Sequence, residues 1–187
     1  MGRKKDDGLT LTLTPLATAD GQAIETLLDA AFGADRHRRT AYRLRDGVEW
    51  LPELSFAAWE EERLVGTLQS WPVALRTAAG RERLVMVGPV AVLPERQGKG
   101  VGSALMDRLI LSADGDTADA MMMIGDPDYY GRWGFTAERT AGWRIDGPYE
   151  QYRLLARLRR ETATEGELVP SRHPGEGRDP AFLCTAA

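Results

Sequence analysis

The feature that most constrains the fold of this chain is the stretch 84–111, where a strand pattern, a glycine-rich turn and a helix pattern follow one another. Residues 84–93 are apolar, rich in β-branched side chains and too few to span a membrane, so they predict a buried strand. Pro94 ends it, and glycine then stands at positions 98, 100 and 102. Apolar residues recur at four-residue steps after Gly100, which predicts a helix beginning there.

A turn of this kind between a strand and a helix has a chemical consequence. The first N–H groups of a helix have no partner within it, and the helix dipole adds partial positive charge at that end. Glycines lack a Cβ atom and therefore let a bulky anion come close to those N–H groups. The turn predicts a site for a phosphate or a diphosphate. The alternative is a tight turn that needs glycine and binds nothing.

Two common phosphate-binding motifs do not match this turn. The P-loop needs a glycine five positions before the glycine of Gly-Lys-Ser/Thr, but Leu93 occupies that position, and Gly100 stands where Ser or Thr is needed. The dinucleotide fingerprint needs a glycine where Ser103 stands. A third pattern, Gln/Arg-x-x-Gly-x-Gly/Ala, is matched by QGKGVG at residues 97–102. With the preceding VAVLPER at 90–96, it closely resembles the acetyl-CoA motif of the GCN5-related N-acetyltransferases (GNAT).

A second motif carries the same resemblance. Residues 125–135 read GDPDYYGRWGF, and the pattern GDPxYYGRxGF resembles a bacterial subgroup of the GNAT family. Asp126 is a natural helix N-cap and Pro127 suits the first helical position. The resemblance extends over about residues 9–159.

The rest of the chain predicts an α+β fold in α/β layers with one mixed sheet. Periodicity and turn signals predict these elements. Strands are expected at 9–14, 55–60, 64–75, 118–124, from 135 and at 152–159, and helices over about 20–32, 40–45 and 126–134. The resemblance implies a GNAT-like, mostly antiparallel central sheet with a splayed central strand pair and helices on both faces.

Composition divides the chain into three parts and excludes some functions. Residues 1–8 are expected to be a loose N-terminus, 9–160 the acetyltransferase domain, and 161–187 a disordered or loosely attached extension, because no periodicity survives there. The net charge of −4 gives no reason to expect a nucleic-acid partner. No apolar run reaches the ~20 residues of a membrane helix. The absence of a signal sequence and a single cysteine, Cys184, predict a cytoplasmic protein.

The resemblance implies acetyl-CoA as co-substrate and no metal ion. Its diphosphate would lie on the backbone N–H groups of residues 97–102. Its pantetheine arm would pair like a strand with the backbone near Val90, in the gap of the splayed pair. Arg96 and Lys99 would add positive charge, unless they are only solvated turn side chains. The expected cofactor-binding residues are Val90, Ala91, Val92, Arg96, Gln97, Gly98, Lys99, Gly100, Val101, Gly102 and Ser103.

Tyr130 is the expected catalytic residue, because it matches the tyrosine of the family's Tyr-x-x-x-Gly-Phe, which faces the CoA sulfur. A phenol of pKa about 10 protonates a thiolate of pKa about 8–9 only slightly uphill. The alternative is a core tyrosine, and its neighbour Tyr129 is expected to pack. The general base is not readable from the sequence, and the candidates are Glu53, Glu60 and Glu150.

Three functional hypotheses remain at this stage. The first is an N-acetyltransferase whose acceptor is the primary amine of a small molecule or peptide, acting as a monomer or homodimer. The second is a CoA- or acyl-CoA-binding sensor or regulatory module without transferase activity, and the third uses a different acyl group. In this family, substrate selection usually falls to regions that correspond here to 36–42 and 139–149. The basic residues at 36–39 could attract an acidic acceptor or be a solvated loop. The tryptophans at 50, 59, 71 and 143 could line a pocket or pack in the core.

Overall fold

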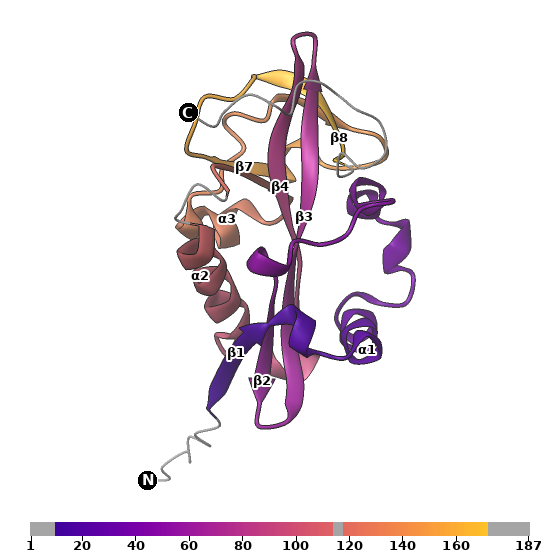
Figure 1. Cartoon of the computed structure of the whole chain (residues 1–187), viewed down its shortest axis with the longest axis vertical. Helices are drawn as coiled ribbons and strands as arrows, with labels where there is room; N and C mark the ends of the chain where they lie inside the picture. Colours follow the sequence, from indigo (N-terminus) through magenta and orange to yellow (C-terminus); the bar gives the residue numbers. More distant parts are fainter. Residues whose placement is uncertain (1–9, 114–117, 172–187) are drawn as a thin grey trace.

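A computed structural model describes residues 10–113 and 118–171, and within them the chain forms one mixed sheet with helices on both faces (Figure 1). The strands are β1 (Leu11–Pro15), β2 (Phe56–Glu60), β3 (Arg63–Thr77), β4 (Gly80–Val92), β5 (Ala120–Ile124), β6 (Gly142–Ile145), β7 (Leu154–Leu158) and β8 (Glu165–Pro170). The helices are α1 (Gly21–Phe32), α2 (Val101–Ala113) and α3 (Pro127–Tyr130). Short 3₁₀ segments include η2 (Arg36–Arg38), η3 (Thr40–Arg45), η4 (Pro52–Leu54) and η7 (Gln151–Arg153).

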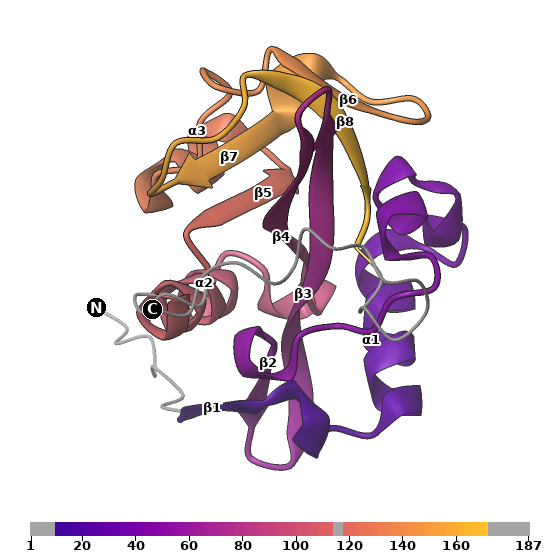
Figure 2. The ribbon, with the colours of Figure 1, turned by 45° about the horizontal axis from the view of Figure 1, so that its top comes forward.

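The sheet is mostly antiparallel, in the order β1-β2-β3-β4-β5-β7. The long β3–β4 hairpin runs through the whole molecule, with α2 and α3 on one side and α1 on the other (Figures 1 and 2). Each of these helices has an apolar face because it packs against one face of the sheet. Leu105 and Leu109 of α2 are fully buried against one face, and Leu27 and Leu28 of α1 are buried against the other. The predicted α+β layering is therefore confirmed.

Side-chain caps begin α1 and α3, and a glycine ends the helical segment around α3. The Asp20 side chain accepts hydrogen bonds from the N–H groups of Gln22 and Ala23, which otherwise lack a partner at the start of α1. Asp126 accepts from the N–H of Asp128 in the same way at α3. Gly134 ends the 3₁₀ segment Gly131–Trp133 that follows α3, with φ of 80°, in the left-handed region that glycine enters without a steric penalty.

The central parallel pair, β4 and β5, separates soon after it forms. The two strands are paired only at Val85↔Met121 and Met86↔Met122. Beyond this point β4 continues along β3, while β5 continues along β7 as far as Ile124. The register of β3 and β4 shifts where Gly88 and Pro89 interrupt β4, and Gly88 has φ of 124°. The predicted splayed pair is confirmed, and the bulge at Gly88-Pro89 lies where the strands part.

Several predicted elements differ from those observed. Residues 40–45 form the 3₁₀ segment η3 in place of an α-helix, and Thr136 forms a single bridge with Ala156 in place of a strand from Phe135. Residues 139–149, for which no strand is predicted, contain β6, which pairs with β8. Both strands are short and depend on partners far away in sequence, so their own residues carry a weak signal.

The extension expected at 161–187 is corrected where the structure describes it. Residues 165–170 form β8, which pairs with Val73–Arg76 of β3. β2 covers only the first part of β3, and β8 supplies backbone partners to its outer part. Leu168 is the anchor, since it is 2% exposed in a core with the fully buried Trp143. Residues 1–8 and 172–187, the other parts expected to be loose, lie outside the described residues, as does Cys184.

Candidate functional site

The glycine turn presents unpaired backbone donors at the start of α2. Gly98 and Gly100 have φ of 73° and 86°, and a Cβ atom at either would meet nothing within 4 Å. The first hydrogen bond of α2 runs from the Ala104 N–H to the Gly100 carbonyl, at 2.9 Å. Within the described part of the chain, no acceptor is recorded for the N–H groups of residues 98, 100, 101, 102 and 103. Such a cluster of free donors at a helix N-terminus can hold an anion.

The predicted cofactor-binding residues around this turn differ in their contacts and in their exposure. Arg96 pairs with Glu60 at 2.5 Å, and both side chains are largely buried. Gln97 donates from Nε2 to the Val92 carbonyl at 3.2 Å, which ties the turn to the end of β4. Ala91 and Val101 are buried in the core, so each can offer only its backbone. Lys99 is exposed.

Two cavities lie beside the turn and the splayed strands. The smaller, of about 430 Å³, is lined by Val92, Arg96, Gln97, Ser103 and the three glycines 98, 100 and 102. The larger, of about 880 Å³, is lined by β4 at 86–90 and β5 at 123–124, so it occupies the opening of the sheet. Val90 and Tyr130 belong to this second cavity. Tyr129 borders both cavities and marks where they approach each other.

Tyr130 lies on α3 at the edge of the larger cavity. Its ring packs so closely on the backbone of Gly125 that a Cβ atom there would come within 2.6 Å of it. Tyr129 meets the ring edge-on, with centroids 4.8 Å apart. No hydrogen-bond partner of its hydroxyl is recorded within residues 10–113 and 118–171. Burial first, and then Tyr129 and Asp126, raise the pKa of Tyr130 to about 12. The phenol is therefore a proton or hydrogen-bond donor throughout the physiological range.

Tyr129 and Arg132 are site residues that sequence reasoning missed. A Cβ atom on Gly102 would lie 3.0 Å from the Tyr129 hydroxyl, which places that hydroxyl over the first turn of α2. Arg132 stacks on the Tyr129 ring at 4.6 Å, and both line the smaller cavity. The signal was present in the motif YYGRWGF, since Arg132 stands three residues after Tyr129 and therefore reaches the same side of a short helical segment.

Of the three carboxylates considered as a base, one lies at the larger cavity. Glu150 lines it and pairs with Arg153 at 3.7 Å. Glu60 is engaged with Arg96 beside the glycine turn, and Glu53 is exposed on η4. Asp126, which caps α3, also faces the cavity.

Comparisons with known proteins agree with this geometry. A family model of the acetyltransferase (GNAT) domain matches residues 12–137, a range that contains the glycine turn and Tyr130. The fold is similar to a GNAT family acetyltransferase from Brucella melitensis in complex with acetyl-CoA, at 23% identity and a TM-score of 0.57, covering 87% of this chain and 97% of that one. It is also similar to the GNAT family N-acetyltransferase YhbS from Escherichia coli in complex with CoA, at 23% identity and a TM-score of 0.67, covering 91% and 94%. No curated protein sequence matches the chain.

Proposed function

The chain belongs to the GNAT acetyltransferase family, and on this premise we propose that it transfers the acetyl group of acetyl-CoA to a primary amine by direct attack on the thioester. The observation that carries the proposal is the continuity of the site. A turn of unpaired N–H groups adjoins a sheet opening that leads to a cavity with a phenol at its edge. An anion-binding end, a slot and a proton donor are the three parts that this reaction needs.

The glycine turn would hold the diphosphate of acetyl-CoA. The five free N–H groups at positions 98 and 100–103 supply the donors, and the open space at Gly98 and Gly100 allows phosphate oxygens to approach. Arg132 lines the same cavity and adds a cation that faces it. Lys99 is exposed and does not line the cavity, so we assign it no contact with the phosphates. The two similar solved proteins hold acetyl-CoA and CoA, which supports the same ligand here.

The pantetheine arm would lie in the opening of the sheet. Beyond Met86, β4 is no longer paired with β5, so one edge of β4 from Val87 to Val92 faces the cavities. An amide-rich arm can pair with the backbone groups near Val90 and Val92 as an added strand would. This places the thioester toward Tyr130.

The chemistry then needs a nucleophile, a stabilised oxyanion and a leaving group. The neutral amine nitrogen forms a bond to the thioester carbonyl carbon, and a backbone N–H near Val90 faces the developing oxyanion. The carbon–sulfur bond breaks, and the Tyr130 hydroxyl donates a hydrogen bond to the leaving thiolate. The proton that the amine nitrogen loses passes to Glu150 or to water. The acceptor would reach the thioester through the opening of the larger cavity, as a small molecule or as the end of a peptide.

No described helix is long and apolar enough to cross a membrane.

The test begins with acetyl-CoA binding by thermal shift and isothermal titration calorimetry. Gly100→Asp and Gly100→Asn form a matched pair, because both residues tolerate a positive φ and they differ in charge. We expect acetyl-CoA to stabilise the wild type and Gly100→Asp to bind at least about tenfold more weakly than Gly100→Asn. A wild type that acetyl-CoA does not stabilise would refute the proposal and the sensor hypothesis together.

A screen of amines for CoA release then separates enzyme from sensor. We expect thiol release with at least one primary amine, and none with tertiary amines of similar shape. Binding of acetyl-CoA without release for any amine would favour the sensor. Tighter binding of propionyl-CoA than of acetyl-CoA would indicate a different acyl group.

A further inference from the structure

The larger cavity has an arginine-rich wall, but most of its guanidinium groups are already engaged. Arg36 is 2% exposed, pairs with Asp29 at 2.7 Å and with Glu25, and donates to the Tyr42 hydroxyl. Arg153 pairs with Glu150 and donates to the Gly125 carbonyl. The basic residues at 36–39, which could attract an acidic acceptor or be a solvated loop, therefore include a structural cation, Arg36. The charge available to a ligand lies elsewhere.

Among the arginines of this wall that are not fully exposed, Arg45, at the end of η3, is the exception. Its guanidinium carbon lies 4.4 Å from the centre of the Tyr42 ring and 5.5 Å from that of Trp71. Within the described residues it forms no ion pair with a carboxylate, and its buried Nε has no hydrogen-bond partner. Burial lowers the pKa of Arg45 to about 10, so the group is still cationic at neutral pH. A desolvated charge without a counter-ion is unfavourable unless a ligand supplies one.

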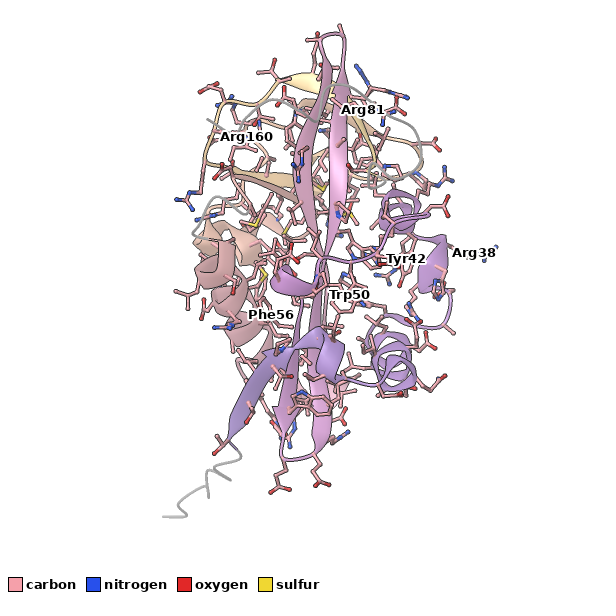
Figure 3. All side chains as sticks on the ribbon, viewed as in Figure 1. Arg38, Tyr42, Trp50, Phe56, Arg81 and Arg160 are labelled. Carbon is pink, nitrogen blue, oxygen red and sulfur yellow. The ribbon has the colours of Figure 1, made fainter. Side chains whose placement is uncertain are left out.

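The position of Arg45 is set before any ligand arrives. Two carboxylates of α1 hold Arg36, and Arg36 holds the Tyr42 hydroxyl, so the ring beneath Arg45 cannot turn freely. In Figure 3 Tyr42 lies nearer to the sheet than Arg38, which points to the outer edge of the molecule. A guanidinium held on an aromatic ring loses little side-chain entropy when it binds an anion.

We propose that Arg45 binds a carboxylate carried by the acceptor amine, so that the substrate is an amino acid or an amine of similar charge. Arg45 and Tyr130 line the same cavity of about 880 Å³, which has room for an acceptor between them. A planar guanidinium matches a carboxylate with two parallel hydrogen bonds. A simple ammonium without an anion would instead be repelled by Arg45. The inference deepens the proposed function and rests on it for the role of the amine.

Equilibrium binding to the full-length chain tests this directly. Calorimetric titrations compare α- and ω-amino acids with their amides, which retain the ammonium and lose the carboxylate, in the presence and absence of CoA. We expect at least one acid to bind about 10- to 100-fold more tightly than its amide, the range of a charge-assisted hydrogen-bonded pair. O-phosphoethanolamine against ethanolamine forms a separate arm, and a preference confined to that pair would overturn the carboxylate assignment.

Three variants locate the effect. Arg45→Met should abolish the preference for acid over amide, Arg45→Lys should retain part of it, and Arg38→Met, on the exposed rim of the same cavity, should leave it unchanged. CoA affinity should stay within about twofold of wild type in all three, which shows that they are folded. The proposal is wrong if no acid binds, if acids and amides bind alike, or if Arg45→Met retains the preference. Failure of the wild type to bind CoA would instead refute the proposed function, since the titrations without CoA still decide the role of Arg45.

Discussion

Tyr130→Phe removes the proposed donor to the leaving sulfur and keeps the ring that packs on Gly125. With the pKa of Tyr130 raised to about 12, complete transfer of its proton to a thiolate of pKa about 8.5 is uphill by about 5 kcal/mol. In the proposed reaction the hydroxyl is therefore a hydrogen-bond donor to the developing charge, and full proton transfer is not required. A hydrogen bond to a charged group contributes about 1.5–3 kcal/mol, so kcat should fall about 10- to 150-fold.

The assay is thiol release with an accepted amine, read as kcat and as the KM for acetyl-CoA. The neighbouring tyrosine gives a matched control, because Tyr129→Phe removes the same atom from a hydroxyl that lies over Gly102 at the smaller cavity. Tyr130→Phe should lower kcat with KM nearly unchanged, whereas Tyr129→Phe should mainly raise the KM for acetyl-CoA. A Tyr130→Phe enzyme with more than half of the wild-type kcat would refute the assignment.

Three further predictions concern stability, measured by urea unfolding. Gly66→Ala should lower the free energy of unfolding by about 1–3 kcal/mol, because its Cβ would lie 2.7 Å from a methyl group of α2. Gly21→Ala, where a Cβ meets nothing within 4 Å, should cause no measurable change. Equal effects of the two substitutions would show that α2 does not pack on Gly66. Leu168→Ala should cost about 2–5 kcal/mol if β8 belongs to the domain, against almost nothing for the exposed Leu111→Ala. Because the pKa of Tyr130 is raised to about 12, the free energy of unfolding should decrease at alkaline pH. Below pH 10 the phenol is protonated in the folded and the unfolded chain, so the free energy of unfolding does not change with its titration. Between pH 10 and 12 the phenol ionises in the unfolded chain but not in the folded one, and the free energy of unfolding falls by about 2–3 kcal/mol. The Tyr130→Phe variant should lack this decrease with pH. An equal decrease in the variant and the wild type would contradict the raised pKa.

The parts of the candidate site that could be read in the sequence are those built from consecutive residues. The glycine turn and the start of α2 follow from the residues at 98–102. The cap of α3 follows from Asp126. In each case one residue type meets a requirement of its own backbone, a positive φ or an unpaired N–H, and that requirement does not depend on distant segments.

The parts that could not be read depend on partners far apart in the chain. Glu60 was considered as a base, but the structure pairs it with Arg96 beside the turn. Tyr129 was expected only to pack, yet it lines both cavities. Arg45 carried no signal at all, because an arginine after a leucine is ordinary. Its environment is set only in the fold, where β3 brings Trp71 against it and no carboxylate among residues 10–113 and 118–171 pairs with it.

By itself, the sequence determined that a glycine-rich turn joins a buried strand to a helix, since glycine content, proline stops and apolar spacing act over a few residues. Only the tertiary structure decided how far β4 and β5 stay together, that residues 165–170 complete the edge of β3, and which charges face the larger cavity. The physical reason is that strand pairing and charge compensation are settled between segments tens of residues apart. Their free energy depends on what each backbone group and side chain meets in space.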